Sequence, residues 1–421
     1  MKANGAEDTL ERSVARIIGQ VRREGDRAVV RLTRKYDRAR IGPASLIVSR
    51  RETSAAIRAV GHGFVRLVHG IARVIAAYHR RQLPRPEMFR NVHGAQVGWV
   101  YTPVHRAGLY IPAGTAPLVS TAVMTIVPAR VAGVEEIIVA TPPGREGGVN
   151  PYILAACAEL GAGMVVRAGG AQAIAALALG TKRIPRVDLI AGPGNIYVTE
   201  AKRQLYGAVG IDMTAGPSEV AVIADGGADA AFIAADLLSQ AEHDPLSSAV
   251  LFTPSAALAS RVRSAVRAQA RALPRLAPLI KQGGAGIRIV KCRSLTDAVR
   301  RANRMAPEHL QIVTAEPLTV LASVRNAGAV FLGPYSPAAL GDYVAGPSHV
   351  LPTGGAARFA QGLSVETFLK RISCVRYDRK SLRKAAPSAG RLAEIEGLEA
   401  HVRALRIRCA GGRGWRRLSW E

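Results

Sequence analysis

The segment SQAEHD, residues 239–244, places glutamine, glutamate, histidine and aspartate together at the end of an alanine-rich run. The run has the pattern of a helix, and Gln240 and His243, three residues apart, would share one face of it. Metal-binding pairs use this spacing, although glutamine is not among the usual ligands of zinc. The pair alone therefore leaves two interpretations open, half of a metal site and a solvated helix end.

A second candidate lies in APEHLQIVT, residues 306–314, where Glu308 and His309 stand at the mouth of a predicted strand. A carboxylate beside an imidazole can serve as acid and base. Histidine also titrates near neutral pH, which suits repeated proton transfer. The alternative is a solvated turn in front of the strand.

Two further segments carry possible metal ligands. Asp342 and His349 lie in GDYVAGPSHVLPTGG, a loop rich in glycine and proline, and Glu396 and His401 lie five residues apart in AEIEGLEAH. Two histidines and one aspartate, with a weaker fourth ligand, would suit one divalent metal ion. The spacing alone does not show that these segments meet, and a surface helix also explains AEIEGLEAH.

The usual dinucleotide signature, GxGxxG after a strand, is absent. The nearest segment is AGPGNIYVTEAKR, residues 191–203, which has the pattern of a strand, a glycine turn and a helix. The exposed N–H groups at the start of such a helix can hold phosphate. A tight turn without a ligand is the alternative.

The elements that must position these residues are short apolar strands that alternate with alanine-rich helices. This alternation predicts an α/β fold with a mostly parallel, doubly wound sheet. In such sheets ligands bind at the carboxyl ends of the strands, so we expect the polar segments to gather there. Helices are expected in residues 13–83 and in the C-terminal appendage. The predicted strands fall in two blocks. The first block is 107–112, 134–143, 162–170, 187–195 and 218–225, and the second is 247–254, 286–291, 309–314 and 327–333.

Composition narrows the class of protein. A chain of 421 residues should form two or three domains. The apolar runs are too short to cross a bilayer, no secretory signal is visible, and the four widely spaced cysteines form no CxxC pair, so we expect a cytoplasmic protein. The net charge of +26 is mostly arginine spread along the chain with few aromatic residues. This spread favours solvated faces over nucleic-acid binding, and attraction of an anionic cofactor or partner stays open.

Seven motifs occur in order along the chain: GLYIPAGTAPLVSTAVMT, GPGNIYVTEAKR, DMTAGPSEV, DLLSQAEH, APEHL, GDYVAGPSHVLPTGGAARF and AEIEGLEAH. Together they resemble the histidinol dehydrogenase family over about residues 14–408. The resemblance implies two incomplete Rossmann-like domains with small helical N- and C-terminal extra domains. The expected boundaries are 1–11 for an N-terminal segment, 12–109 plus 220–363 for the domain with the metal and catalytic residues, 110–219 for the NAD-binding domain, and 364–421 for a C-terminal domain exchanged between subunits.

The resemblance also implies an activity, the zinc- and NAD-dependent four-electron oxidation of L-histidinol through L-histidinal to L-histidine, in histidine biosynthesis. His309 would take the alcohol proton as hydride leaves for NAD, Glu308 would then activate water, and His309 would act again on the hydrate. The residues implied by the motifs are Gln240, His243, Asp342 and His401 as ligands of one Zn²⁺ per subunit; Ser218, Gln240, His243, His309, Asp342, His349, Glu396 and His401 at the substrate; and Tyr110, Gln172 and Asn195 at NAD.

The family further implies a homodimer in which the C-terminal domain reaches the active site of the other subunit, so that His401 of the partner subunit completes the metal site. No nucleic-acid or membrane partner is expected. Histidinol carries a positive amine and the protein is cationic, so the site itself must be locally acidic. Glu308, Asp342 and Glu396 would provide that acidity.

Two other interpretations stand beside this one. The first is a paralogous NAD-dependent dehydrogenase of another small amino- or sulfo-alcohol, and the second is a basic nucleic-acid-binding protein that has kept an enzyme scaffold. The chain also departs from the family pattern, since Ala113 stands where a second glycine is usual and Ser348 where asparagine is common. Neither departure removes a proposed catalytic or metal residue.

Overall fold

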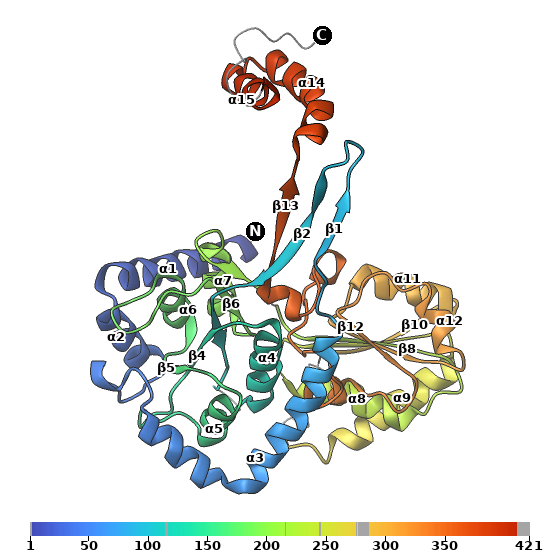
Figure 1. The fold of residues 1–421 in the computed structure, drawn as a ribbon. Coiled ribbons are helices and arrows are strands. Elements are labelled where there is room, and N and C mark those ends of the chain that lie inside the picture. The colour runs from blue at the N-terminus through green and yellow to red at the C-terminus, as the bar shows by residue number, and fades with distance from the viewer. Residues whose placement is uncertain are drawn as a thin grey trace. The chain divides into compact units, whose positions relative to one another are not determined.

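The computed structural model describes residues 2–113, 117–214, 216–243, 246–274, 276 and 286–410, without the side chains of residues 2–8 and of His243. The chain forms two compact units. The first unit comprises Met1–Leu83 and Val104–Phe368, and the second comprises Pro84–Pro103 and Leu369–Glu421. Figure 1 shows the elements of both units along the chain.

The first unit contains two parallel sheets of five strands each. The first sheet has the order β5-β4-β3-β6-β7 and the second has the order β10-β9-β8-β11-β12. Counted along the chain, both orders read third, second, first, fourth, fifth, which is the Rossmann order without its sixth strand. The predicted α/β class with two Rossmann-like halves is therefore confirmed.

The first sheet and its helices follow the predicted alternation of strand and helix. Apolar strands of this kind are covered on both faces, so their side chains are buried almost without interruption. The elements are β3 (Arg106–Tyr110), α4 (Val119–Ala132), β4 (Glu136–Thr141), α5 (Pro151–Glu159), β5 (Met164–Arg167), α6 (Gly170–Leu179), β6 (Leu189–Ala191), α7 (Ile196–Leu205) and β7 (Gly210–Ile211).

The second sheet repeats the pattern with different helices. Its strands β8 and β11 lie side by side at the centre and run parallel. The elements are β8 (Glu219–Ala224), α8 (Ala230–His243), β9 (Ser248–Thr253), α9 (Ala256–Ala270), β10 (Ile287–Lys291), α11 (Leu295–Met305), β11 (His309–Val313), α12 (Pro317–Leu321), β12 (Ala329–Leu332) and α13 (Ala338–Tyr343), followed by the short helices η2 (Ala356–Arg358) and η3 (Val365–Phe368).

The N-terminal helices α1 and α2 pack against the first sheet. The helices are α1 (Lys2–Glu24), α2 (Asp26–Tyr36), η1 (Pro43–Ser45) and α3 (Arg50–Arg80). Val14 and Val29 of α1 and α2 share a core with Ile138 and Ile174 of the first sheet and its helix α6. Helical periodicity shows which face of a helix is buried, but not which sheet that face covers.

The second unit contains an antiparallel sheet that lies outside the two predicted blocks of strands. Strand β2 lies between β1 and β13, and it pairs along its length with β13, from Gln96 opposite Arg376 to Pro103 opposite Leu369. This pairing joins segments far apart in sequence, so neither segment predicts it alone. The elements are β1 (Glu87–Arg90), β2 (Gln96–Pro103), β13 (Leu369–Arg376), α14 (Arg379–Ile395) and α15 (Glu399–Ala410).

Helix α4 of the first unit is buried on nearly every side and contacts segments of both sheets. The Ser348 hydroxyl donates to the carbonyl of Met124 over 2.9 Å, and the Thr121 hydroxyl lies 3.3 Å from His349 Nε2. These bonds fasten the loop that follows α13 to the helix that follows β3. None of the helices in the described part of the chain is both long and apolar enough to cross a membrane.

A buried ion pair fixes the glycine turn in front of α7. The Lys202 ammonium contacts the Asp212 carboxylate, and both side chains are almost fully buried, with 2% and 0% exposed. Lys202 also donates to the Gly192 carbonyl over 3.1 Å, and Asp212 accepts from the Gly192 N–H over 2.8 Å. The pair therefore holds both backbone polar groups of Gly192.

We expect Lys202→Met to lower the free energy of unfolding by roughly 3–5 kcal/mol, because it leaves Asp212 buried without its counter-charge. The matched control is Arg203→Gln on the same helix, where an ion pair with Glu11 lies at the surface and should contribute less than about 1 kcal/mol. Urea unfolding followed by circular dichroism measures both. Equal losses in the two variants would contradict the importance of the buried pair.

Candidate active site

Glu308 and His309 lie at the amino end of β11, beside the amino end of β8. Both are buried, with 6% and 5% exposed. The Glu308 carboxylate accepts a hydrogen bond from the Glu219 N–H over 3.0 Å and one from the Ser218 side chain. Because β8 and β11 are neighbours, a single carboxyl group bonds across the starts of both central strands.

The surroundings of Glu308 favour its protonated form. Burial raises the pKa of Glu308 to about 8, and the negative charge of Asp342 adds to the rise, while the hydrogen bonds from Glu219 and Ser218 oppose it. A positive charge close to the carboxyl group would lower this pKa again. Glu308 is therefore poised to gain or lose a proton near neutral pH, as a general acid or base must be.

His309 lies between two carboxyl groups. Its Nδ1 is 3.7 Å from Glu308 Oε2, and its Nε2 is 3.9 Å from Asp342 Oδ1, which belongs to α13. The ring also lies against Phe331 of β12, with 5.9 Å between the ring centroids. Each ring nitrogen of His309 therefore has a carboxyl group within about 4 Å.

His349 lies near the same groups. Its Nδ1 is 3.0 Å from the backbone carbonyl of Asp342, so it donates there in the tautomer that carries the proton on Nδ1. Ser348, where the family commonly has asparagine, is 3% exposed and uses its hydroxyl to bond Met124 and to accept the Val350 N–H. The departure at Ser348 therefore keeps a buried polar side chain with partners of its own.

Gln240 lies on α8 and is 5% exposed. Within the part of the chain that the structure describes, its Nε2 has no hydrogen-bond partner, and a buried amide in that state is uncommon. One turn earlier, Asp236 accepts from Gln311 Nε2 over 3.0 Å. Gln311 and His309 share one face of β11 because side chains alternate along a strand. The polar face of α8 therefore covers the face of β11 that carries His309.

The four expected metal ligands are spread over three helices. His243 is the last residue of α8, three residues after Gln240, and its side chain lies outside the described part of the chain. Asp342 lies on α13, which contacts α8. His401 lies on α15 in the second unit, as an exposed residue.

No group of three or more His, Cys, Asp or Glu side chains that could hold a metal occurs among the residues that the structure describes. The expected ligands do not form such a group for three reasons. Gln240 is an amide, the side chain of His243 lies outside the described residues, and His401 belongs to the second unit. The donors that are described, a buried Gln240 amide with an unused polar atom and the Asp342 carboxylate, are of the kinds that can bind a divalent cation.

A cavity of about 460 Å³ opens at His309, a volume suited to a small-molecule ligand. Its wall is formed by residues from the C-terminal end of α3 and from the loop after α13, including Tyr78, His79, Gln82, Phe331 and His349. The carboxyl–imidazole pair therefore has a space beside it in which a reacting group can lie.

The expected cofactor residues lie at the carboxyl edge of the first sheet. Tyr110 ends β3, and its hydroxyl accepts from the Gly170 N–H over 3.1 Å, while burial raises the pKa of Tyr110 to about 12. Gln172 lies on α6 with its amide 3.4 Å from Asp37. Asn195 caps α7 by accepting from the N–H groups of Tyr197 and Val198.

Gly192 brings the turn before Asn195 close to Tyr110. Its φ of +116° lies in the region that favours glycine, and a Cβ at this position would collide with the Tyr110 carbonyl. The structure therefore places Tyr110, Gln172 and Asn195 after β3, β5 and β6, as the rule for open α/β sheets predicts.

The same rule is wrong for the second sheet. Ser218, Glu308 and His309 lie at the amino ends of β8 and β11, not at the carboxyl ends. The reason is the contact of the loop after α13 with α4, which joins the amino edge of the second sheet to the carboxyl edge of the first. The candidate site therefore uses opposite edges of two sheets with the same strand order.

Glu396 and His401 are placed together by the second unit alone. Glu396 is the C-cap residue of α14, and His401 lies in the first turns of α15. Both are exposed within that unit. The structure thus brings Glu308, His309, Asp342, His349 and Ser218 together, with Gln240 on the adjoining helix, and leaves Glu396 and His401 as a separate pair.

Sequence analysis missed several polar residues that support the site. Asp37 follows α2 and accepts from the Gly169 N–H over 3.2 Å, across 132 residues of sequence. Asp236 and Gln311 form a similar long-range bond. No local sequence pattern predicts such contacts. The one available signal is Gln311, a single polar residue in an apolar strand, which indicates a buried polar partner.

These features define a class of enzyme, an α/β oxidoreductase with two Rossmann-like halves and an acid–base pair at a small-molecule cavity. The chain belongs to the histidinol dehydrogenase family, whose model matches residues 1–409. The family is one of oxidoreductases in histidine biosynthesis.

Known relatives match along nearly the whole chain. The histidinol dehydrogenase of Moorella thermoacetica is 49% identical over 406 residues, covering 96% of this chain and 95% of that protein. The histidinol dehydrogenase of Synechococcus sp. is 47% identical over 399 residues, covering 94% and 92%. The crystal structure of histidinol dehydrogenase from Elizabethkingia anophelis superposes with a TM-score of 0.91 at 36% identity, covering 96% of this chain and 92% of that one.

Asp37 gives a prediction for stability against pH. Burial raises the pKa of Asp37 to about 6, against hydrogen bonds from Gly169 and Gln172 that lower it. The folded state therefore binds a proton more tightly than the unfolded state, and the stability this contributes is lost as pH rises from about 4 to about 6. Two pKa units correspond to about 2.7 kcal/mol, which partial exposure reduces to about 1–2 kcal/mol.

We expect Asp37→Asn to remove this loss. The difference in free energy of unfolding between the variant and the wild type should therefore shift by about 1–2 kcal/mol in favour of the variant as the pH rises from 4 to 6.5. Glu146→Gln is the control, because the Glu146 side chain is 79% exposed. Urea titrations across this pH range give the differences. A constant offset of Asp37→Asn from the wild type would rule the titration of Asp37 out.

Proposed function

We propose that this chain oxidises L-histidinol through L-histidinal to L-histidine and reduces two NAD in the process. The observation that carries the proposal is the buried Glu308–His309 pair beside a small cavity, with Asp342 close to the imidazole and Gln240 on the adjoining helix. Membership of the histidinol dehydrogenase family supports the identity of the substrate. The proposed setting is histidine biosynthesis in the cytoplasm.

The acid–base chemistry is assigned to His309 and Glu308. His309 accepts the proton of the alcohol as hydride leaves the carbon, and the nearby carboxylates stabilise the imidazolium that forms. Glu308 then takes a proton from the water that attacks the aldehyde. His309 acts a second time when the hydrate loses its hydride. The positive charge of the bound substrate favours the ionised form of Glu308, which the second step requires.

The residues assigned to Zn²⁺, one per subunit, are Gln240, His243, Asp342 and the partner subunit's His401. The support within this chain is the buried Gln240 amide beside the acid–base pair and the contact of α8 with α13. When bound, the metal supplies an anchor for the imidazole and amine of histidinol. Nitrogen and oxygen ligands leave room for substrate in the coordination sphere.

The remaining assignments concern substrate, cofactor and assembly. Ser218, His349 and Glu396 are assigned to histidinol, together with the metal ligands and His309, and Tyr110, Gln172 and Asn195 to NAD. Glu396 and the metal ligand His401 lie in the second unit, which we assign to the site of the other subunit in a homodimer. The carboxylates of Glu308, Asp342 and Glu396 counter the positive charge of the protein at the site.

The first test counts NADH formed from L-histidinol and NAD by purified protein, followed to completion. We expect two NADH per histidinol, loss of the reaction with a chelator, and its return with zinc. One NADH per histidinol would mean that the aldehyde escapes, and would contradict the role given to Glu308. A zinc-loaded protein that forms no NADH from histidinol would reject this substrate and point to another small alcohol.

The proposed exchange of the second unit predicts complementation. We expect His401→Ala and His309→Ala homodimers to be inactive, the first through a lost metal ligand and the second through a lost base. After mixing and subunit exchange, about a quarter to a half of the wild-type activity should return, since one site per mixed dimer is intact. Mixing His309→Ala with Asp342→Ala is the control, because both residues lie in the first unit. Activity that stays absent in the first mixture would exclude a site shared between subunits.

A further inference from the structure

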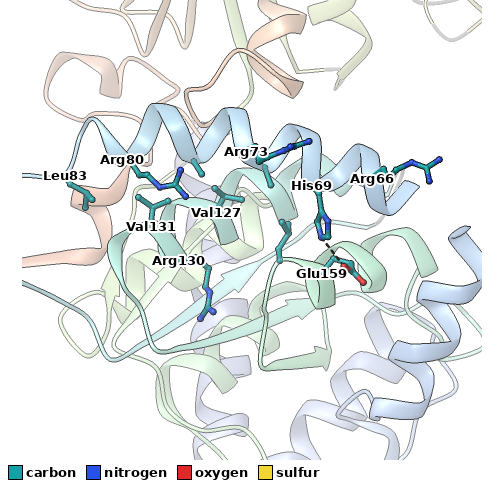
Figure 2. A pocket seen from close by; sticks show the side chains of 12 residues that line it. Arg66, His69, Arg73, Arg80, Leu83, Val127, Arg130, Val131 and Glu159 are labelled. Atoms are coloured by element: carbon teal, nitrogen blue, oxygen red, sulfur yellow. Dashed lines mark ion pairs between the residues drawn. The ribbon is translucent and has the colours of Figure 1, made fainter. Parts of the chain in front are cut away.

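A groove of about 960 Å³ runs along α3 in the first unit, away from the residues assigned to catalysis. Figure 2 shows α3 above α4 and α5, with arginine side chains along the groove. Arg66, Arg73 and Arg80 follow one another at intervals of seven residues, so they lie on one face of the helix. Arg130 of α4 lines the same groove.

The described residues do not neutralise the positive charge of this groove. In the described residues, no carboxylate lies within ion-pair distance of Arg66, Arg73, Arg80 or Arg130. Glu159, the only acidic residue among those that line the groove, pairs with His69 over 3.0 Å. The C-terminal ends of α4 and α5 contribute only about half a negative charge each. Four arginines, one glutamate and these two helix ends leave a net positive charge of about two.

The floor of the groove is apolar. Ala72 and Ala76 of α3 line the groove, and Val127 and Val131 of α4 lie below α3 in Figure 2. Guanidinium groups match phosphate oxygens in a two-bond geometry, and several arginines in a row suit a chain of phosphates. An apolar floor suits a planar, weakly polar group attached to those phosphates. The volume is in the range of small-molecule sites.

We propose that the α3 groove binds a small anion that carries two or more phosphates, of the size of a nucleoside triphosphate. The charge requires an anion, and the apolar floor suits the rest of such a ligand. The three arginines of α3 span about 21 Å along the helix, so the phosphates of one ligand contact only part of the row. The site is distinct from the cavity at His309. They meet at the end of α3, where Arg80 lines the groove while Tyr78 and His79 line the cavity.

The test is isothermal titration of the purified protein with ATP at fixed ionic strength. The variant Arg73→Gln/Arg80→Gln removes two charges from the groove. The matched control Arg51→Gln/Arg58→Gln removes two exposed charges from the same helix outside the groove. Both pairs leave the same net charge, so they separate a built site from general attraction to a cationic protein. We expect the dissociation constant to rise at least tenfold in the groove variant and less than twofold in the control.

Three outcomes would overturn the proposal. The first is that the wild type does not bind ATP, and the second is that both double variants lose equal affinity for ATP. The third is that the groove variant binds ATP as tightly as the wild type, which would assign the ATP to the carboxyl edge of the first sheet. All four substituted arginines are exposed, so the variants should fold, which circular dichroism checks. NADH formation from histidinol by the groove variant should equal that of the wild type, so this test fails or succeeds independently of the proposed function.

Discussion

The burial of one carboxyl group, that of Glu308, sets the conditions for the rest of the site. A carboxyl group loses much of its hydration when it is buried, and it stays in such a place only if protein donors replace the water. The donors here are the Glu219 N–H and the Ser218 side chain. Both stand at the start of β8, so the arrangement requires β8 and β11 to be adjacent. The third-second-first-fourth-fifth strand order supplies that adjacency.

The two halves of the first unit use this shared order in opposite ways. In the first sheet the ends of β3, β5 and β6 carry the cofactor candidates at the carboxyl edge. In the second sheet the acid–base pair lies at the amino edge, against α4 of the other half. The two copies of one topology thus carry their candidate residues at different edges, and the loop that holds Ser348 and His349 is hydrogen-bonded to α4 of the first half.

Polar groups buried in pairs fix the segments that carry the site. Lys202 and Asp212 hold the turn at Gly192, Asp37 holds the start of α6, and Asp236 holds Gln311 beneath α8. Each pair links positions distant in sequence, and each would be costly to leave half satisfied. The arginine groove on α3 differs from these buried pairs, because its charged side chains have no acidic partner in the described part of the chain. We propose that an anionic ligand supplies the opposite charge.

The amino-acid sequence was enough to predict the α/β class and the alternation of strands and helices, because these depend on local periodicity. Its motifs also single out Glu308 and His309 as candidates for acid–base chemistry. It also determined that Gln240 and His243 share a helix face. Only the tertiary structure decided that Glu308 and His309 stand at an amino edge, that α1 and α2 cover the first sheet, and that residues 96–103 pair with residues 369–376. Those outcomes depend on contacts between segments far apart in the chain, and no local pattern carries information about which distant surface a buried face will meet.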